Sequence, residues 1–515
     1  MKYSKYICLL LLIVAFGCNQ NYSKKVKATL KSAGRNKKEL LKALKHYEND
    51  SLKYDALLFL IENMNNKNGV SYQLTNFFGK PVDYKPEKYV SWGNARKALD
   101  SIEDNHYYFV KTKEDNIPDV KVISANYLIN TVDLAFDCWL NKPWAKHVNY
   151  SDFKEYILPY RARNEKLTNW RPKLMKMYDS ILIENNLKSC HDPVQVCKLI
   201  NDHLADWITY GPGFSIIKNI QSVDNILDTK KGTCMDLTIM AACTMRSVGL
   251  PISIDFTPFW ADRGFGHSWN SVIDTTGNSV HFNAIDKNCP PGNYPINAKI
   301  AKVFRLPFSN NSESLAVKTK NLNKIPETFR IPNMIDITPI YTNVSNITLT
   351  NYTLPSQKAE TAYLSVFNRN KWKPIYWGFI KNNKILFNNM GIDVLYLPVV
   401  YHKNKKVPIA DPLILRKDSS ITFLKANTAV KIDLVLTHYY DEIVGIRTKK
   451  EIIPGSYSLY YWDDNWVFVN NCKTASNNIT FTMVPSNGLY KIVAENHNYD
   501  FIRVFTYENN EQVWW

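Results

Sequence analysis

Hydrophobic positions recur at spacings of three and four residues in the first third of the chain. Segments 37–46 and 52–64 both place their apolar side chains on one face of a helix, and residues 123–140 repeat the pattern. This periodicity predicts a mainly helical N-terminal region over residues 19–185.

The pattern changes over residues 186–300, where helices give way to strands. Helices are predicted first, over residues 194–207, 223–227 and 234–248. Gly249 and Pro251 supply the stop signal of the last helix. Alternating apolar and polar positions then predict strands over 252–256, 266–273 and 279–286. This order predicts an α+β core in which the last helix packs on an antiparallel sheet.

From about residue 340 the chain reads as β structure alone. Short runs rich in Val, Ile, Thr, Tyr and Trp alternate with turn residues, for example at 361–367, 384–387, 394–401 and 456–462. A spacing of roughly 8–12 residues between such runs is typical of β-sandwiches. We therefore expect sandwich-like domains over 341–425 and 426–515, joined to the core by residues 301–340. The chain as a whole is predicted to be multidomain.

The N-terminus reads as a targeting segment. Residues 1–18 hold two lysines and then an apolar stretch, Leu9 to Phe16, that is too short to span a bilayer. The stretch ends in Ala-Phe-Gly before Cys18 and resembles a bacterial lipoprotein signal. The resemblance implies export, with Cys18 lipidated and anchored in the cell envelope, at the outer membrane or the cell surface. Simple secretion is the alternative.

The formal net charge of +17 is spread along the chain, with one dense basic run at residues 24–38. A basic run that follows a lipid anchor suits an anionic membrane surface. We find no zinc-finger spacing and no RNA-binding strand motif, so nucleic acid is not an expected partner. No other segment is long and apolar enough to be predicted as a membrane span.

Nine cysteines are present, and seven remain when Cys8 and Cys18 are set aside. Their spacing fits neither a set of zinc ligands nor a dense disulfide scaffold. A calcium-loop signature is also absent from the core, and we expect no metal and no organic cofactor. Because seven is odd, at least one thiol should be free. Catalysis is one reason for a free thiol in an exported protein.

Cys234 is the candidate nucleophile, because it stands at the start of the helix predicted over 234–248. A helix start offers free N–H groups and a partial positive charge, which lower a thiol pKa and can hold an oxyanion. Gly232 would let the backbone approach closely. The competing interpretation is a buried structural cysteine.

His267 lies on a predicted strand, with Trp269 on the same face. Such a histidine could take the thiol proton and return it to a leaving group. A four-residue hairpin loop at 275–278 would place Asp286 opposite His267, where it could orient the imidazole. Asn283 is the alternative third member, and it requires a different turn.

Three sequence motifs accompany these residues. They are Thr233-Cys-Met-Asp236, Met245-Arg-Ser-Val-Gly-Leu-Pro251 and Gly266-His-Ser-Trp-Asn270. Together with Trp207-Ile-Thr-Tyr210, they are similar to the transglutaminase-like superfamily over about residues 190–290. Phe282 stands where that family usually has Trp, and Leu250 where it has Ile.

The resemblance implies a transglutaminase/papain-like core in which Cys234, His267 and Asp286 are catalytic. It implies attack on an amide or peptide bond of a protein or peptide substrate through a thioester. Water would make the protein a peptidase or amidase, whereas an amine would make it a transglutaminase. Tyr210, Trp260 and Trp269 are expected to contact the oxyanion or the substrate.

Two further expectations stay open. The segment 156–165, with Trp170 and Arg171, is expected either to form structural charge pairs or to contact substrate. The alternative function is a non-catalytic surface lipoprotein whose β domains capture glycan or protein. The tryptophans that could stack on sugars, unless they pack in a core, are Trp377, Trp462, Trp466, Trp514 and Trp515.

Overall fold

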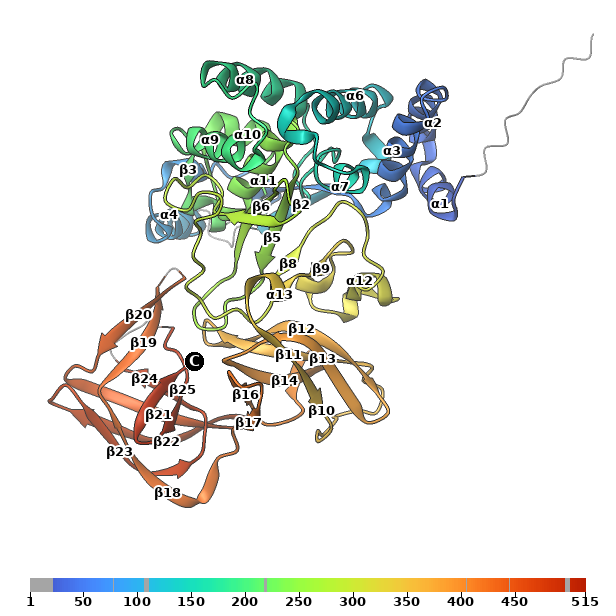
Figure 1. Ribbon diagram of the computed structural model, residues 1–515. Helices are drawn as coiled ribbons and strands as arrows, with labels where there is room; N and C mark the ends of the chain where they lie inside the picture. The colour runs from blue at the N-terminus through green and yellow to red at the C-terminus, as the bar shows by residue number, and fades with distance from the viewer. Residues whose placement is uncertain are drawn as a thin grey trace, which may run out of the picture.

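The computed structural model describes residues 22–76, 78–105, 111–216, 220–403, 405–443, 445–495 and 501–515. The predicted signal and Cys18 lie outside the described residues. Helices gather at one end of the molecule and strands at the other, with the core between them (Figure 1). Among the described helices, none has the length and apolar character needed to cross a membrane.

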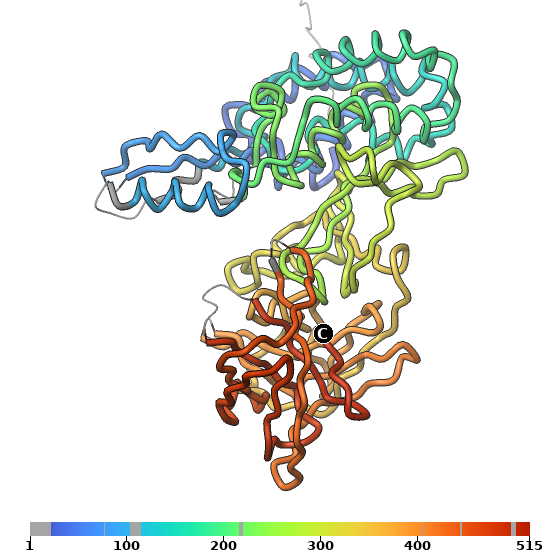
Figure 2. The backbone as a smooth tube through the Cα atoms, turned by 90° about the vertical axis from the view of Figure 1, so that its left-hand side faces the viewer, coloured from blue at the N-terminus to red at the C-terminus, as the bar shows by residue number. Residues whose placement is uncertain are grey.

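The N-terminal region is mainly helical, as predicted. Its helices are α1 Lys24–Ala33, α2 Lys37–His46, α3 Ser51–Glu62, α4 Trp92–Asn105, α5 Asp119–Val122, α6 Ala125–Asn141, α7 Tyr150–Tyr156 and α8 Trp170–Glu184. The three predicted helical segments correspond to α2, α3 and α6. An antiparallel pair, β1 (Asn68–Thr75) with β2 (Lys111–Pro118), was not predicted. Together with α4 it extends to one side of the helices (Figure 2).

The core is α+β and centres on one buried helix. Its helices are α9 Pro193–Ala205, α10 Val223–Thr229 and α11 Cys234–Ser247. The sheet has the antiparallel order β7-β6-β5-β8-β9, with bounds Ser279–Phe282, His267–Ile273, Ile252–Thr257, Phe304–Arg305 and Ile335–Asp336. Helix α11 packs on β5 and β6, and every residue from Asp236 to Ser247 is buried. An apolar helix of this kind is expected where both sides face protein.

A buried ion pair ties the sheet together. The Arg305 guanidinium on β8 donates to the two carboxylate oxygens of Asp255 on β5 at 2.7 and 2.8 Å. Ser271 and Tyr341 also donate to Asp255, at 2.8 and 2.6 Å. Burial alone would raise the pKa of Asp255, but Arg305 and the hydroxyl donors hold it below its ordinary value. The sheet is therefore joined to α13 (Thr338–Tyr341) through one carboxylate.

Residues 301–340 also contain α12 (Leu315–Lys318), which lies near the β end of the core (Figure 1). Beyond α13 the described chain forms antiparallel strands. One sheet has the order β10-β13-β12-β11-β14-β16-β17, with β15 beside β14. Its strands are β10 Val344–Leu349, β11 Thr361–Asn368, β12 Lys371–Lys381, β13 Lys384–Gly391, β14 Val394–His402, β15 Lys405–Pro408, β16 Leu413–Leu415 and β17 Ile421–Phe423.

The last part of the chain has the sheet β22-β21-β24-β25-β26 and the pairs β18–β23 and β19–β20. The strands are β18 Asn427–Leu436, β19 His438–Ile443, β20 Ile446–Glu451, β21 Gly455–Asp463, β22 Asn465–Thr474, β23 Ile479–Ser486, β24 Tyr490–Ala494, β25 Phe505–Glu508 and β26 Glu511–Trp514. The predicted order of a helical region, an α+β core and a region of antiparallel β structure behind it is confirmed.

Candidate active site

Cys234 is the first residue of α11, as the sequence predicts. Thr233 caps the helix: its hydroxyl accepts from Asp236 N–H at 3.3 Å, and the Asp236 carboxylate accepts from Thr233 N–H at 2.8 Å. Gln221 N–H donates to the other carboxylate oxygen at 2.8 Å. This capping box fixes where the helix begins. The first N–H groups of a helix have no partner within it, so those of Cys234 and Met235 can face an oxyanion.

Gly232 lies directly against the start of α11 and belongs to a short pair of strands. A Cβ on Gly232 would lie 2.6 Å from Asp236 Cβ, so a side chain would displace the cap. The short strand β4 (Lys231–Gly232) pairs in parallel with β3 (Thr209–Tyr210), and Tyr210 is the partner of Gly232. Burial raises the pKa of the half-exposed Tyr210, and the negative charge of Cys234 raises it further. Tyr210 is therefore close enough to feel the charge of the sulfur, and its contact with the oxyanion or the substrate stays a prediction.

His267 opens β6, opposite Thr257 of β5. Its Nε2 lies 3.0 Å from Asn283 Oδ1. The imidazole is stacked on the rings of Trp260 and Trp269, with centroids 6.5 and 6.1 Å away. Because Asn283 occupies Nε2, Nδ1 is the nitrogen left for the sulfur.

Cys234 and His267 shift each other's proton affinity. Burial alone would raise the pKa of the Cys234 thiol, but a hydrogen bond from His267, its charge and hydrogen bonds from Ser268 bring the pKa below its ordinary value. Burial alone would lower the pKa of His267, but the Cys234 thiolate, Asn283 and the charge of Asp286 raise it. Both shifts favour a thiolate beside an imidazolium.

The buried cysteines behave in the opposite way. Burial raises the pKa of Cys138 to about 12, and it also raises those of Cys197 and Cys243. None of the seven cysteines in the described part of the chain is in a disulfide. A lowered pKa on a residue that is not fully buried therefore distinguishes Cys234 from these three.

Asn283, and not Asp286, is the residue that bonds the imidazole of His267. The direct contact that was expected between Asp286 and His267 is absent. Asp286 is one hydrogen bond further out, where its Oδ2 accepts from Asn283 Nδ2 at 2.9 Å. Asp286 therefore holds the Asn283 amide with its oxygen toward the imidazole. The catalytic roles of these residues stay predictions.

The physical reason is a hairpin loop that is one residue shorter than expected. Asp274 N–H donates to Asn278 C=O at 2.9 Å, which leaves three loop residues and puts Gly277 at φ +84°. The register then pairs Ile273 with Ser279, and β7 ends at Phe282 instead of continuing to 286.

Beyond β7, the buried Asn201 of α9 holds the turn that carries Asn283 and Asp286. Its Oδ1 accepts from Ile285 N–H at 2.7 Å and its Nδ2 donates to Asp286 C=O at 3.0 Å. Ile285 adopts φ +59° there. The path of this turn, and not strand pairing, brings Asn283 to the imidazole.

A family model of the transglutaminase-like superfamily matches residues 182–284. The core domain is transglutaminase-like. Among solved structures, the chain is similar to the crystal structure of red sea bream transglutaminase, with 10% identity and a TM-score of 0.20, over 87% of this chain and 78% of that one. No curated protein matches the chain. The matched segment includes Cys234, His267 and Asn283 and ends before Asp286.

In the transglutaminase-like core, Trp260 and Trp269 lie behind the imidazole. Their rings are parallel, with centroids 6.2 Å apart and an interplanar angle of 4°. Trp269 is fully buried and donates to Tyr341 Oη at 3.0 Å, so the expectation that it contacts substrate is wrong. Trp260 is 8% exposed, which leaves only an edge for a ligand. Both rings instead fix the plane of His267.

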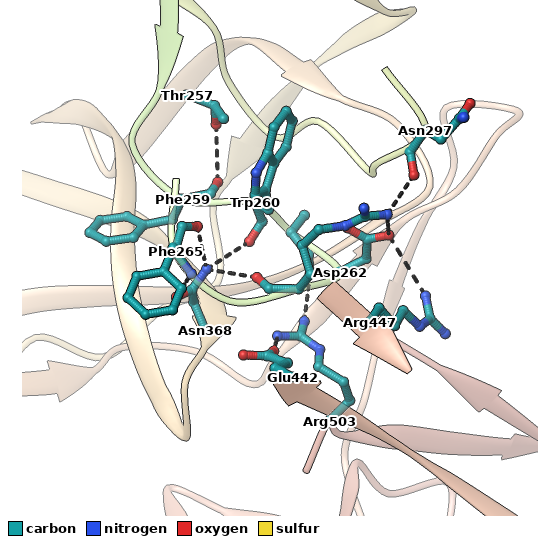
Figure 3. A network of polar contacts seen from close by, with 12 residues as sticks. Thr257, Phe259, Trp260, Asp262, Phe265, Asn297, Asn368, Glu442, Arg447 and Arg503 are labelled. Carbon is teal, nitrogen blue, oxygen red and sulfur yellow. Dashed lines mark hydrogen bonds and ion pairs between the residues drawn. The ribbon is translucent and has the colours of Figure 1, made fainter. Parts of the chain in front are cut away.

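The loop between β5 and β6 is held by the β domains (Figure 3). Asn368 Nδ2 donates to the carbonyls of Trp260, Arg263 and Phe265, and its Oδ1 accepts from Phe265 N–H. The fully buried Arg503 donates to Ala261 C=O at 2.6 Å and pairs with Glu442. Residues far along the chain therefore position the loop that ends at His267. No local sequence signal could have predicted this.

The segment 156–165 forms structural charge pairs, the first of the two alternatives that the sequence left open, and its contact with substrate stays a prediction. Arg161 and Asp119 form a buried ion pair, and Arg171 donates to buried backbone carbonyls. Arg163 differs, because its charge interacts with Cys234 and its Nη1 lies 3.6 Å from Met235 Sδ. Sequence reasoning had marked this segment but could not single out Arg163.

Within the described residues, no cluster of three or more His, Cys, Asp or Glu side chains is arranged to hold a metal ion. The indoles of Trp462, Trp514 and Trp515 are buried in the β domains, so these three rings offer no face for stacking on a sugar.

Proposed function

We propose that the protein is a cysteine-nucleophile enzyme that acts on amide bonds of proteins or peptides through a thioester. Within that class we favour hydrolysis over transfer to an amine. The single observation that supports the cysteine chemistry most is the pairing of Cys234, at the start of α11, with His267, whose Nε2 bonds Asn283; the same contacts lower the pKa of the thiol and raise that of the imidazole.

In the proposed reaction, the Cys234 thiolate adds to the amide carbonyl carbon. The resulting oxyanion faces the N–H groups at the start of α11, with the Tyr210 hydroxyl nearby. The His267 imidazolium gives its proton to the departing nitrogen as the C–N bond breaks, which leaves a thioester on Cys234. Asn283 keeps the imidazole in one orientation throughout.

In the second half of the reaction, neutral His267 takes a proton from the acceptor as it attacks the thioester carbonyl. Water gives a carboxylic acid, and a primary amine gives a new amide. Either acceptor restores the thiolate–imidazolium pair. The proposed chemistry needs no metal or organic cofactor, because the attacking group is already anionic.

A fluorogenic peptide-amide library tests the proposal. We expect turnover by the wild-type protein and less than about 1% of it in Cys234→Ser and His267→Ala, since removing a nucleophile or its base typically costs several powers of ten. Adding an alkyl amine separates the two acceptors: hydrolysis leaves free acid as the main product, and transfer gives the new amide. Equal turnover in Cys234→Ser would overturn the proposal.

We also propose that the chain is exported and lipid-anchored to the bacterial cell envelope through Cys18. The signal-like residues 1–18 and the basic run after them support this. Labelling cells with an alkynyl fatty acid should mark the wild-type chain and not Cys18→Ser. Label that persists in Cys18→Ser would contradict the anchor.

A further inference from the structure

A cavity of about 210 Å³ lies between the segment 159–164 and the residues that follow β8. Its wall holds five basic residues, Lys67, Arg161, Arg163, Arg246 and Arg330, and none of the described residues that line it is acidic. Cavities that enclose a whole drug-sized ligand have roughly 300–1,000 Å³. This one therefore has the size of a subsite for a single group.

Two of the five cations are already used by the protein. Arg161 is bound to Asp119 and to the Glu165 carbonyl, and Arg246 donates to the Ile252 carbonyl at 2.7 and 3.2 Å. These contacts satisfy both guanidinium groups, so the two arginines contribute positive potential to the cavity but few free hydrogen-bond donors.

Lys67 is the unusual member of the cavity wall. It is 7% exposed, and within the described part of the chain its ammonium has neither a hydrogen bond nor an ion pair. The ammonium lies over the Phe308 ring, whose centroid is 4.7 Å away. Burial, with Arg161 beside it, lowers the pKa of Lys67 to about 7. A buried cation without a partner is costly, and a bound anion would remove that cost.

The carboxylates near Lys67 are engaged elsewhere. Asp119 is held by Arg161 and Tyr160. Glu155 accepts from the backbone N–H groups of Phe308 and Ser309 at 2.8 and 3.0 Å. Both attract Lys67 only at a distance, so the ammonium keeps its hydrogen-bonding capacity for a ligand.

Arg163 connects this cavity to the nucleophile. It lines the cavity, its guanidinium lies 5.6 Å from the Phe256 ring centroid, and its Nη1 reaches Met235 Sδ next to Cys234. No described carboxylate side chain forms an ion pair with it. Arg330, the third uncommitted cation, is exposed, and within the described residues its guanidinium donates only to the Ile325 carbonyl, at 3.1 Å.

We infer that this cavity binds a carboxylate of the substrate, carried by an acidic residue or a chain end near the bond that is attacked. The inference rests on the proposed function, and it makes acidic peptides the preferred substrate class. Lys67 and Arg163 would hold the carboxylate from two sides, with Arg330 at the mouth. Charge-assisted hydrogen bonds from both would favour the anion over a neutral group of the same shape.

The experiment compares matched fluorogenic peptides that carry Glu, Gln or phosphoserine at one position on either side of the scissile amide. For wild type we expect kcat/KM to be at least about tenfold higher for Glu than for Gln at one position. This Glu:Gln ratio of kcat/KM should fall below about 3 in Lys67→Met and be retained in Lys67→Arg. Arg330→Gln, at an exposed position, should lower it without a folding defect.

Lys154→Met is the matched control. This lysine also lies over aromatic rings, Tyr150 and Phe59, but it pairs with Asp55 and does not line the cavity. It should keep the wild-type ratio. A higher kcat/KM for phosphoserine than for Glu would replace the carboxylate with a phosphate and overturn the assignment.

A binding measurement separates the two proposals. Fluorescence anisotropy of labelled Glu and Gln peptides with Cys234→Ala reports the cavity without turnover. Turnover by wild type with a Glu:Gln ratio near 1 at every position would overturn the cavity inference and leave the enzyme. No turnover and no labelling of Cys234 by an electrophilic amide would overturn the enzyme. Weaker binding of the Glu peptide in Lys67→Met would then still support the cavity.

Discussion

Replacing Asn368 by alanine should impair a reaction centre in another domain. Its side chain makes contacts of 3.1, 2.8, 2.9 and 3.0 Å with the backbone of Trp260, Arg263 and Phe265, and it is 1% exposed. At about 0.5–1.5 kcal/mol net for each hydrogen bond, and with one amide shared among them, the loop should lose roughly 2–4 kcal/mol.

The loop transmits this loss to the imidazole. Trp260 N–H donates to Phe265 C=O at 2.9 Å, and the Trp260 ring stacks on His267. Gly266, which precedes His267, has no room for displacement, because a Cβ there would lie 2.2 Å from Pro258 C=O. If half of the lost energy, about 1–2 kcal/mol, is needed to restore the productive His267 orientation, kcat should fall about 5- to 30-fold.

The assay is steady-state hydrolysis of the best fluorogenic peptide, with circular dichroism as the check on folding. We expect kcat to fall and KM to change by less than about threefold, since the loop acts on the imidazole. Asn368→Asp should be at least as impaired, because it turns a carboxylate toward three carbonyls. Asn351→Ala, at an exposed position of the same domain, is the control. A folded Asn368→Ala protein with kcat within twofold of wild type would refute the coupling.

Three further perturbations follow from the same geometry. Asn283→Ala should lower kcat by roughly 10- to 100-fold, and Asp286→Asn by less than about tenfold, because Asp286 acts through Asn283. Steady-state kinetics that give the reverse order would restore Asp286 as the direct partner of His267. Gly232→Ala should slow alkylation of Cys234 and lower the melting temperature, whereas Gly93→Ala, with nothing within 4 Å, should do neither. Arg305→Met should lower the free energy of unfolding by about 3–5 kcal/mol at neutral pH, because it leaves the buried Asp255 carboxylate unpaired. The pKa of Asp255 is depressed in the wild-type fold, so its stabilising contribution is present above about pH 4 and is lost below it. Urea titrations should therefore show the unfolding free energies of wild type and Arg305→Met converging in acid. A difference in unfolding free energy that widens in acid would contradict this.

Local chemistry accounts for what the sequence could predict. The start of α11 is specified within five residues by Gly232, Thr233 and Asp236, so the position of Cys234 at a helix start was predictable. Strands β5 and β6 follow from alternation, and His267 falls on β6 for that reason.

The remaining features depend on contacts between distant parts of the chain. A hairpin loop shorter by one residue moved the register and ended β7 early, and Asn201 of α9 then set the turn that carries Asn283. Asn368 lies 103 residues from its partner Phe265, and Lys231 donates to Glu87 across 144 residues. Polar contacts of this kind have no periodicity, so reading the sequence could not find them.

The pH dependence of Cys234 alkylation tests the central claim, which is that a thiolate forms beside an imidazolium. In a protein with the other six described cysteines blocked or replaced, iodoacetamide should react with a half-maximal rate below about pH 8.5, the ordinary thiol pKa, and His267→Ala should move that midpoint upward. Turnover should rise as the thiol ionises and fall as the pH passes the raised pKa of His267, where the imidazolium loses the proton that the leaving group needs. An ordinary thiol titration that is identical in wild type and His267→Ala would contradict the account.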